Sequence, residues 1–161
     1  MSIQLVTGNI LDVNTKYIAH QTNCVTKKSS NLAAAVFKRF PFADIYSIRT
    51  DNQIDTPGTI IVKGNGLDQR FVINMLGQFY PGAPKYPDSK KDGFEVRKQY
   101  FFQCLKSILL IEDLQSIAFP YRVGCGVAGG DWDFYYELLE KFAAKVAGRA
   151  EVLVVKLPEE P

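Results

Sequence analysis

Short apolar runs, rich in valine and isoleucine, alternate with helical patterns along the whole chain. Strands are predicted at residues 3–7, 17–22, 59–62, 71–76, 116–119 and 151–157, and helices at 32–40, 94–110 and 133–147. The turn at 64–66 joins two strands as a hairpin, so we expect a mixed sheet. This alternation is typical of an α/β protein built as a three-layer α/β/α sandwich, and the length suits one such domain over residues 1–161. In such folds, ligands bind at the carboxyl ends of the strands.

Apolar spacing predicts which faces of the two longer helices are buried. The predicted positions are Phe94, Phe101, Leu105 and Ile108 in one helix, and Phe134, Leu138, Phe142 and Val146 in the other. The second set repeats every four residues, and Gly148 is placed to end that helix.

The composition is that of a folded globular protein, with 47% apolar and 22% charged residues. The 19 basic and 17 acidic side chains leave a net charge of +2, which gives no argument for nucleic-acid binding. No apolar stretch reaches the roughly 18 residues of a membrane span, and the first residues lack the features of a signal peptide, so we expect an intracellular protein. Three dispersed cysteines and one histidine fit neither a disulfide framework nor a zinc site, and we expect no metal and no cofactor.

The segment from Ala118 to Trp132 is the most informative part of the sequence. A strand leads into a loop with four glycines, between 124 and 130, and the loop leads into a helix. Glycine allows positive φ and close approach of a ligand to the backbone, and consecutive amides near a helix N-terminus bind anions. The loop is therefore predicted to bind a phosphate or pyrophosphate. The alternative is a tight turn without a ligand, although the loop is longer than a turn needs.

The glycines at 124, 126 and 129 also match the dinucleotide-binding motif G-x-G-x-x-G. That motif opens a βαβ unit, with further parallel strands after it and an acidic residue at the end of the next strand. Here only one strand remains, and Glu151 lies at its start. The context therefore argues against a Rossmann fold.

A second polar segment, His20-Gln21-Thr22-Asn23-Cys24, ends an apolar strand. His20, Thr22 and Asn23 can hydrogen-bond hydroxyls or phosphate oxygens, and an imidazole exchanges protons near neutral pH. The alternative interpretation is a polar strand end whose histidine is satisfied by its neighbours. Both interpretations stay open at the level of sequence.

Together these segments resemble macrodomains. The segments 6–11 (VTGNIL), 20–24 (HQTNC), the helix start at 32–33 and Gly124-Cys125-Gly126 occur in the order seen in that family, and the resemblance covers almost the whole chain. The chain looks most similar to the branch with the yeast-type ADP-ribose 1″-phosphate phosphatase and the terminal ADP-ribose protein glycohydrolase. The resemblance implies a cleft that binds ADP-ribose.

The resemblance also implies roles for particular residues. Asn9 and Ile10 would contact the adenine, Asn23 would face the distal ribose, and His20 would take part in catalysis. Two loops, at 30–33 and 123–128, would hold the diphosphate. The full set of expected ligand-binding residues is Asn9, Ile10, Thr22, Asn23, Ser30, Asn31, Leu32, Ala33, Gln78, Tyr121, Val123, Gly124, Cys125, Gly126, Val127, Ala128 and Trp132.

Several positions depart from the family's pattern. Asn9 replaces the usual aspartate, and Gln78 stands where the glycohydrolase has its lysine, so no Schiff base is expected. Ala128 replaces that enzyme's catalytic acid, and Asp131 follows three residues later. The first loop has Ser29-Ser30-Asn31 instead of paired glycines.

Three functions follow as hypotheses. The favoured one is a hydrolase of ADP-ribose 1″-phosphate or a related ADP-ribose ester, in which His20 or Asp131 is the general acid or base. The second is a non-catalytic reader of free or protein-linked ADP-ribose, indicated by the losses at Gln78 and Ala128. The third is nucleic-acid binding through the lysines between 85 and 98, which the small net charge argues against. The expected partners are thus ADP-ribose or ADP-ribose 1″-phosphate and an ADP-ribosylated protein, and neither a membrane nor a nucleic acid.

Overall fold

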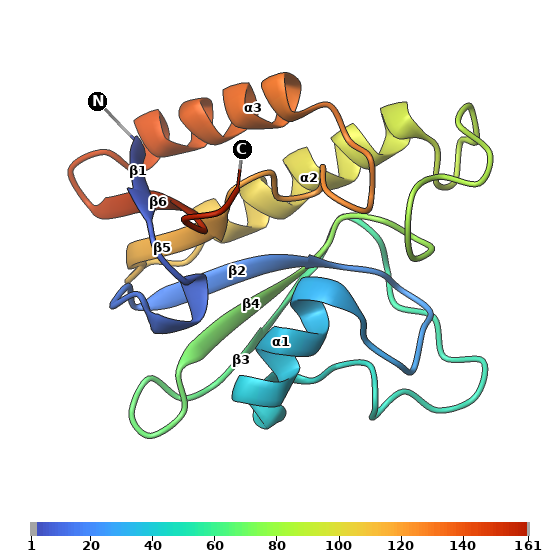
Figure 1. Cartoon of the computed structure of the whole chain (residues 1–161), viewed down its shortest axis with the longest axis horizontal. Coiled ribbons are helices and arrows are strands. Elements are labelled where there is room, and N and C mark those ends of the chain that lie inside the picture. The colour runs from blue at the N-terminus through green and yellow to red at the C-terminus, as the bar shows by residue number, and fades with distance from the viewer. Residues whose placement is uncertain (1–2, 161) are drawn as a thin grey trace.

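The computed structural model describes residues 3–160, and over these residues the chain forms one sheet and three helices (Figure 1). The strands are β1 (Ile3–Thr7), β2 (Tyr17–Thr22), β3 (Ile60–Lys63), β4 (Phe71–Leu76), β5 (Gln115–Pro120) and β6 (Ala150–Lys156). The helices are α1 (Asn31–Arg39), α2 (Phe94–Leu109) and α3 (Trp132–Val146), with short 3₁₀ helices η1 (Ile10–Asp12) and η2 (Pro41–Ala43).

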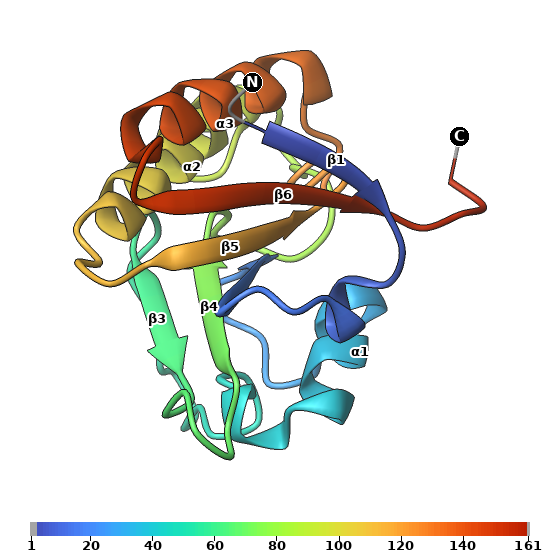
Figure 2. The same cartoon turned by 90° about the vertical axis from the view of Figure 1, so that its left-hand side faces the viewer.

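The sheet has the order β1-β6-β5-β2-β4-β3 and lies between two layers of helices. Helix α1 covers one face, and α2 and α3 cover the other (Figures 1 and 2). Strands β1, β6, β5, β2 and β4 are parallel, whereas β3 pairs with β4 in the antiparallel sense. The predicted mixed α/β/α sandwich and its hairpin are therefore confirmed.

Both faces of the sheet are buried, which explains why its central strands are almost continuously apolar. Along β4, for example, Val72 packs in the cluster beneath α1, while its neighbour Ile73 packs in the cluster beneath α2 and α3. Successive side chains point to opposite faces of a strand, so each strand contributes to two cores.

The predicted elements agree closely with the structure. The strands at 3–7, 17–22 and 71–76 are confirmed with those bounds, and the other bounds differ by one residue. The buried face of α2 is confirmed at Phe101, Leu105 and Ile108. Gly148, with φ of 88°, follows the C-cap of α3 as expected.

The predicted buried face of α3 is partly wrong. The buried positions are Tyr135, Leu139, Phe142, Ala143 and Val146, whereas Phe134 is 37% exposed and Leu138 is half-buried. The cause is geometric: with 3.6 residues per turn, a strict four-residue repeat drifts around the helix by about 40° at each step. Tyr135 and Leu139 replace Phe134 and Leu138 because they stay on the side that faces the sheet.

Within residues 3–160, no helix combines the length and apolar character needed to cross a membrane. Cys24, Cys104 and Cys125 are all buried and free.

Candidate ligand-binding cleft

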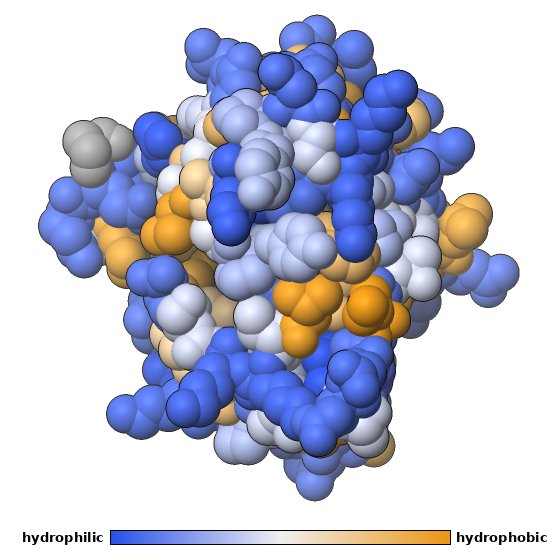
Figure 3. All heavy atoms as spheres, turned by 90° about the vertical axis from the view of Figure 1, so that its right-hand side faces the viewer, coloured by the Kyte–Doolittle hydropathy of each residue, from blue (hydrophilic) through white to orange (hydrophobic). Residues whose placement is uncertain are grey.

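A cavity of about 440 Å³ lies at the carboxyl edge of the parallel strands. Its walls come from the segments that follow β1, β2, β4, β5 and β6, and from the start of α1. Figure 3 shows the face onto which β2 leads, where apolar side chains lie near the middle and hydrophilic ones surround them. The strand order places Asn9 (after β1) and Gln78 (after β4) at opposite ends of the cavity. Four strand spacings of about 4.8 Å separate these strands, or about 19 Å, which suits an elongated ligand.

The first turn of α1 contributes one set of free backbone amides. Ser30 is the N-cap, but its side chain makes no capping hydrogen bond. The amides of Asn31, Leu32 and Ala33 find no acceptor within residues 3–160, and all three residues line the cavity. Lys28 lines it as well. Because the N-terminal end of a helix carries partial positive charge, this wall favours an anion.

The glycine-rich loop contributes a second set of free amides to the same cavity. Turn hydrogen bonds use the amides of Val123 and Cys125, at 3.0 and 2.8 Å. The amides of Gly124, Gly126, Val127 and Ala128 have no acceptor among the described residues, and all four residues line the cavity. Two groups of unpaired donors thus meet in one cleft, as a diphosphate would require.

Gly124 is a position in this loop where only glycine fits. Its φ is 77°, and a Cβ atom there would lie 2.7 Å from the ring of Tyr135 and 2.8 Å from Oε1 of Gln21. Gly126 differs, because its φ is not positive and a Cβ atom there would meet no atom within 4 Å. The two glycines of this Gly-Cys-Gly segment therefore serve different purposes.

One end of the cleft is apolar, with Ile10, Val155 and Leu157 among its lining residues. Asn9 lies there as the N-cap of η1, and its Oδ1 accepts a hydrogen bond of 2.9 Å from the amide of Leu11. This bond uses part of the accepting capacity of Asn9, whose Nδ2 stays a donor. Glu160 supplies the carboxylate of this end and accepts from the amide of Leu157 at 2.8 Å.

The opposite end carries side-chain amides. Gln78 Nε2 donates to the carbonyl of Tyr80 at 2.8 Å. Gln78 Oε1 is therefore the atom that accepts from Gln21 Nε2, at 2.7 Å. Gln21 Oε1 is then buried without a donor among the described residues. Gln78 is 7% exposed and immobilised by these bonds, and an amide has no basic or nucleophilic nitrogen.

The structure brings the expected ligand-binding residues together at this cavity, with one exception. Trp132 lies instead over a separate shallow depression beside α3. Its ring packs edge-on against Tyr121, with centroids 5.4 Å apart. Lys28 is the one lysine among the described residues that line the cavity.

His20 lies in the core beneath α1 and does not line the cavity. It is 2% exposed, and its Nε2 lies 2.7 Å from Oδ1 of Asn74. The Nδ2 atom of Asn74 donates to the carbonyls of Ala43 and Ile61, so the proton of this pair belongs to His20 Nε2. Burial lowers the pKa of His20 to about 4, and its ring is neutral at pH 7. This arrangement matches the interpretation of His20 as a histidine satisfied by its neighbours, although its Nδ1 has no donor within residues 3–160.

The other groups with catalytic potential are also poorly placed. Asp131 is the exposed N-cap of α3, makes no side-chain capping bond and lies outside the cavity lining. Cys125 lines the cavity, but burial raises the pKa of its thiol to about 12, so the thiolate is scarce at pH 7. Within residues 3–160, no group of three or more histidine, cysteine or acidic side chains could hold a metal ion.

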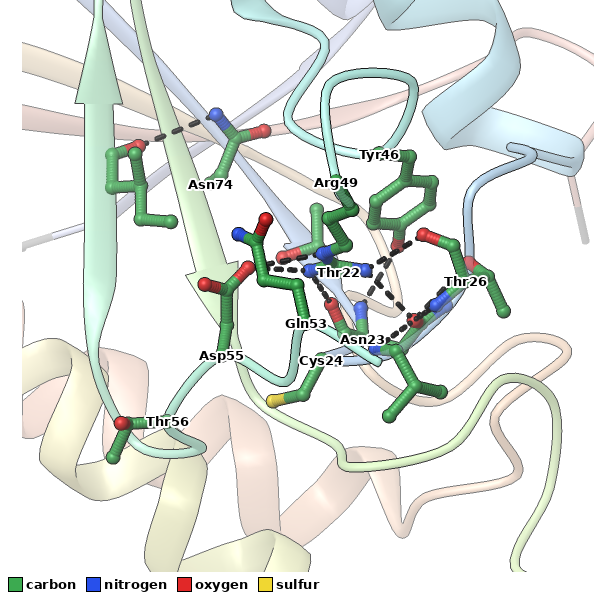
Figure 4. A network of polar contacts seen from close by, with 12 residues as sticks. Thr22, Asn23, Cys24, Thr26, Tyr46, Arg49, Gln53, Asp55, Thr56 and Asn74 are labelled. Carbon is green, nitrogen blue, oxygen red and sulfur yellow. Dashed lines mark hydrogen bonds and ion pairs between the residues drawn. The ribbon is translucent and has the colours of Figure 1, made fainter. Parts of the chain in front are cut away.

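Two residues near the cleft have no signal in the sequence. Tyr46 and Arg49 belong to the irregular segment between η2 and β3, and both contact Asn23 (Figure 4). The hydroxyl of Tyr46 accepts from the amide of Asn23 at 2.8 Å, and Tyr46 itself lines the cavity. No local pattern pairs positions 23 and 49, because the contact depends on how the irregular segment folds back.

No protein-family model matches the sequence, and no curated protein matches it significantly. Solved structures do match. The macrodomain of DarG from Thermus aquaticus is 22% identical with a TM-score of 0.67, over 99% of this chain and 98% of that one. A protein of unknown function from Bacteroides thetaiotaomicron is 23% identical with a TM-score of 0.70, over 96% and 97%. A Trypanosoma brucei macrodomain in complex with ADP-ribose is 16% identical with a TM-score of 0.66, over 97% and 63%. The chain therefore has the macrodomain fold.

Proposed function

We propose that this protein binds ADP-ribose or a close derivative in the cleft, as a non-catalytic reader of the free or protein-linked nucleotide. The observation that carries the proposal is the pair of free amide sets, at the start of α1 and in the glycine-rich loop, which line one cavity. Such amides hold a diphosphate without a metal ion.

The two ends of the cleft fit the rest of such a ligand. The apolar end, with Ile10, Val155 and Leu157, offers a surface for a purine ring, and the amide-lined end offers hydrogen bonds for a sugar. The Trypanosoma brucei structure, which contains ADP-ribose, supports this choice of ligand at the level of fold.

A reader is preferred to a hydrolase because, within residues 3–160, the cleft lining offers no well-placed general base or nucleophile. A hydrolase needs a general base or nucleophile within hydrogen-bond reach of the reacting atoms. His20 and Asp131 do not line the cavity, Gln78 is an amide, and Glu160 belongs to the apolar end. The expected hydrolysis of ADP-ribose 1″-phosphate thus becomes an outcome that an experiment can decide.

Calorimetric titration with ADP-ribose, with AMP as a control ligand, tests the proposal. We expect saturable binding of ADP-ribose and weaker binding of AMP, together with no phosphate release from ADP-ribose 1″-phosphate. The matched variant is Gly126→Val, whose side chain extends into open space at the cavity. It is expected to weaken binding by about tenfold or more, the equivalent of roughly 1.4 kcal/mol, without a change in Tm. No heat with ADP-ribose would contradict the proposal, and phosphate release above background would restore the hydrolase.

A further inference from the structure

Arg49 is a fully buried cation directly behind the end of β2. Its Nη2 donates to the carbonyl of Asn23 at 2.6 Å, and its Nη1 donates to the carbonyl of Thr26 at 2.9 Å (Figure 4). Nε and Nη2 also reach Oδ2 of Asp55, at 3.0 and 2.9 Å. The guanidinium lies over the ring of Tyr46, 4.8 Å from its centroid.

This arrangement is costly to build. Removing a guanidinium from water is unfavourable, and an ion pair of this kind, in which Asp55 is 20% exposed, often adds little net stability. A rigid fork that satisfies two carbonyls and one carboxylate at once is, however, well suited to fixing a conformation. The conformation that Arg49 fixes is that of the segment after β2, whose carbonyls it binds.

The backbone of that segment is held at every polar group next to Asn23. The amide of Asn23 donates to the hydroxyl of Tyr46 at 2.8 Å. The amide of Cys24 donates to the carbonyl of Phe79 at 3.0 Å, and the carbonyl of Cys24 accepts from the amide of Asp55 at 3.0 Å. In this conformation the segment makes all of these contacts together with those to the guanidinium.

The side chain of Asn23 is oriented by the same network. Its Oδ1 accepts from the amides of Val25 and Thr26, each at 3.0 Å, from the hydroxyl of Thr26 at 3.1 Å, and from Arg49 Nη1 at 3.4 Å. Backbone amides and a guanidinium only donate, so Oδ1 must face them and Nδ2 must face the other way. All side-chain hydrogen bonds of Asn23 within residues 3–160 are made by Oδ1, which leaves Nδ2 to donate elsewhere, and Asn23 lines the cavity.

We propose that Arg49 is a positioning residue, which holds Asn23 so that its NH₂ group is a fixed donor at the amide-lined end of the cleft. The inference rests on the proposed function, because that ligand supplies the acceptor: an oxygen of the sugar distal to the purine. A donor fixed in this way strengthens the binding of a ligand that extends past the diphosphate. It also excludes Asn23 as a proton acceptor in any reaction.

Two ligands separate this role from a purely structural one. ADP-ribose reaches the amide-lined end, whereas ADP ends at the diphosphate. Asn23→Ala is expected to weaken ADP-ribose binding about five- to tenfold, as the loss of one preorganised hydrogen bond does, and to change ADP binding less than about twofold. Arg49→Lys keeps a positive charge beside Asp55 but cannot make the fork of bonds, so we expect the same pattern.

The double variant and a matched control sharpen the comparison. In the Asn23→Ala background, Arg49→Lys should produce no further loss of ADP-ribose affinity, because both changes remove the same contact. Arg149→Lys breaks a similar pair of guanidinium bonds, to the carbonyls of Leu109 and Ile111, outside the cleft. It should leave both affinities unchanged. Equal losses for ADP and ADP-ribose in Arg49→Lys, or full additivity in the double variant, would overturn the proposal.

Hydrogen exchange provides a readout that needs no ligand. The amides of Val25 and Thr26 are protected by Asn23 Oδ1, so Arg49→Lys should speed their exchange about tenfold or more, while Arg149→Lys should not. Unchanged exchange would show that Arg49 does not orient Asn23, even if the cleft binds ADP-ribose. Faster exchange in a protein that binds neither ADP nor ADP-ribose would have a different meaning. Arg49 would then orient Asn23, but both the proposed function and the hydrogen bond from Asn23 to a sugar would be refuted.

Discussion

At the scale of single residues, the two glycines of the Gly-Cys-Gly segment show that the same residue type can have two different roles in one loop. Gly124 is required by the fold, since its positive φ and the nearby ring of Tyr135 leave no room for a side chain. Gly126 is free of both constraints, so its lack of a side chain matters to a ligand and not to the fold. A substitution at Gly126 therefore separates binding from stability, which a substitution at Gly124 cannot do.

His20 illustrates a limit of sequence reasoning at the same scale. A strand buried on both faces gives no periodic signal for the direction of any one side chain. The sequence therefore allowed either a histidine that faces a ligand or one that faces the core. The structure places its ring against Phe37 in the layer of α1, 5.3 Å between centroids.

The buried His20 predicts a dependence of stability on pH. Its pKa falls from 6.5 to about 4 on folding, so the unfolded chain binds the proton more readily. The free energy of unfolding should therefore fall as the pH drops through 6.5, with the loss complete below about pH 4. Between pH 7.5 and pH 5 the loss is expected to be on the order of 2 kcal/mol.

Urea unfolding of the wild type and of His20→Gln checks this expectation. Glutamine keeps a donor for Asn74 and does not titrate, so the variant should lose less stability over this range. The difference between the two pH profiles isolates the histidine from the carboxylates, which titrate in both proteins. Parallel profiles would mean that folding does not lower the pKa of His20.

At the scale of elements, the helix α3 shows that the existence of an element is easier to predict than its orientation. Its large apolar residues include those at 134, 135, 138, 139, 142 and 146, and two overlapping stripes can be drawn through these six. The sheet selects the stripe with Tyr135 and Leu139, because tertiary packing decides between nearly equal amphipathic faces.

Neighbouring leucines on α3 provide a matched pair of variants. Leu139 is fully buried and Leu138 is half-buried. Leu139→Ala should lower the free energy of unfolding by about 3 kcal/mol, within the range for large-to-small core changes, whereas Leu138→Ala should cost about 1 kcal/mol. Chemical denaturation of both variants gives the comparison. A larger cost at Leu138 would support the face drawn from the four-residue repeat.

The helix α1 shows a second kind of surprise. Serine is a residue type favoured at the N-cap, yet Ser30 makes no side-chain capping bond, and Asn31 has a φ of 53°. A capping residue identifies where a helix begins, but whether its side chain turns to the amides depends on the surrounding loop. In this protein the amides of the first turn are free and lie at the cleft, although the paired glycines of the family's first loop are absent.

At the scale of the whole molecule, the alternation of strands and helices was sufficient to predict the three-layer sandwich and the edge of the sheet where the cleft lies. Short-range signals also identified the polar end of β2 and the glycine-rich loop after β5. The segment after β1 and the start of α1 were assigned to the site through the resemblance to macrodomains. The contacts of Arg49 with Asn23 and Thr26 could not be predicted in the same way. Arg49 lies 26 positions after Asn23 and 23 positions after Thr26 in the sequence, and the irregular segment brings them together. No local pattern encodes these contacts.

The central claim is that free amides of α1 and of the glycine-rich loop hold the diphosphate of ADP-ribose, and amide chemical shifts test it most directly. In a titration of ¹⁵N-labelled protein with ADP-ribose, we expect the largest shifts at residues 31–33 and 124–128. Shifts at Val25 and Thr26 should be smaller, because their amides are already bonded to Asn23. Shifts confined to other surfaces, or none at millimolar ligand, would contradict the account and leave the protein with the fold but without this function.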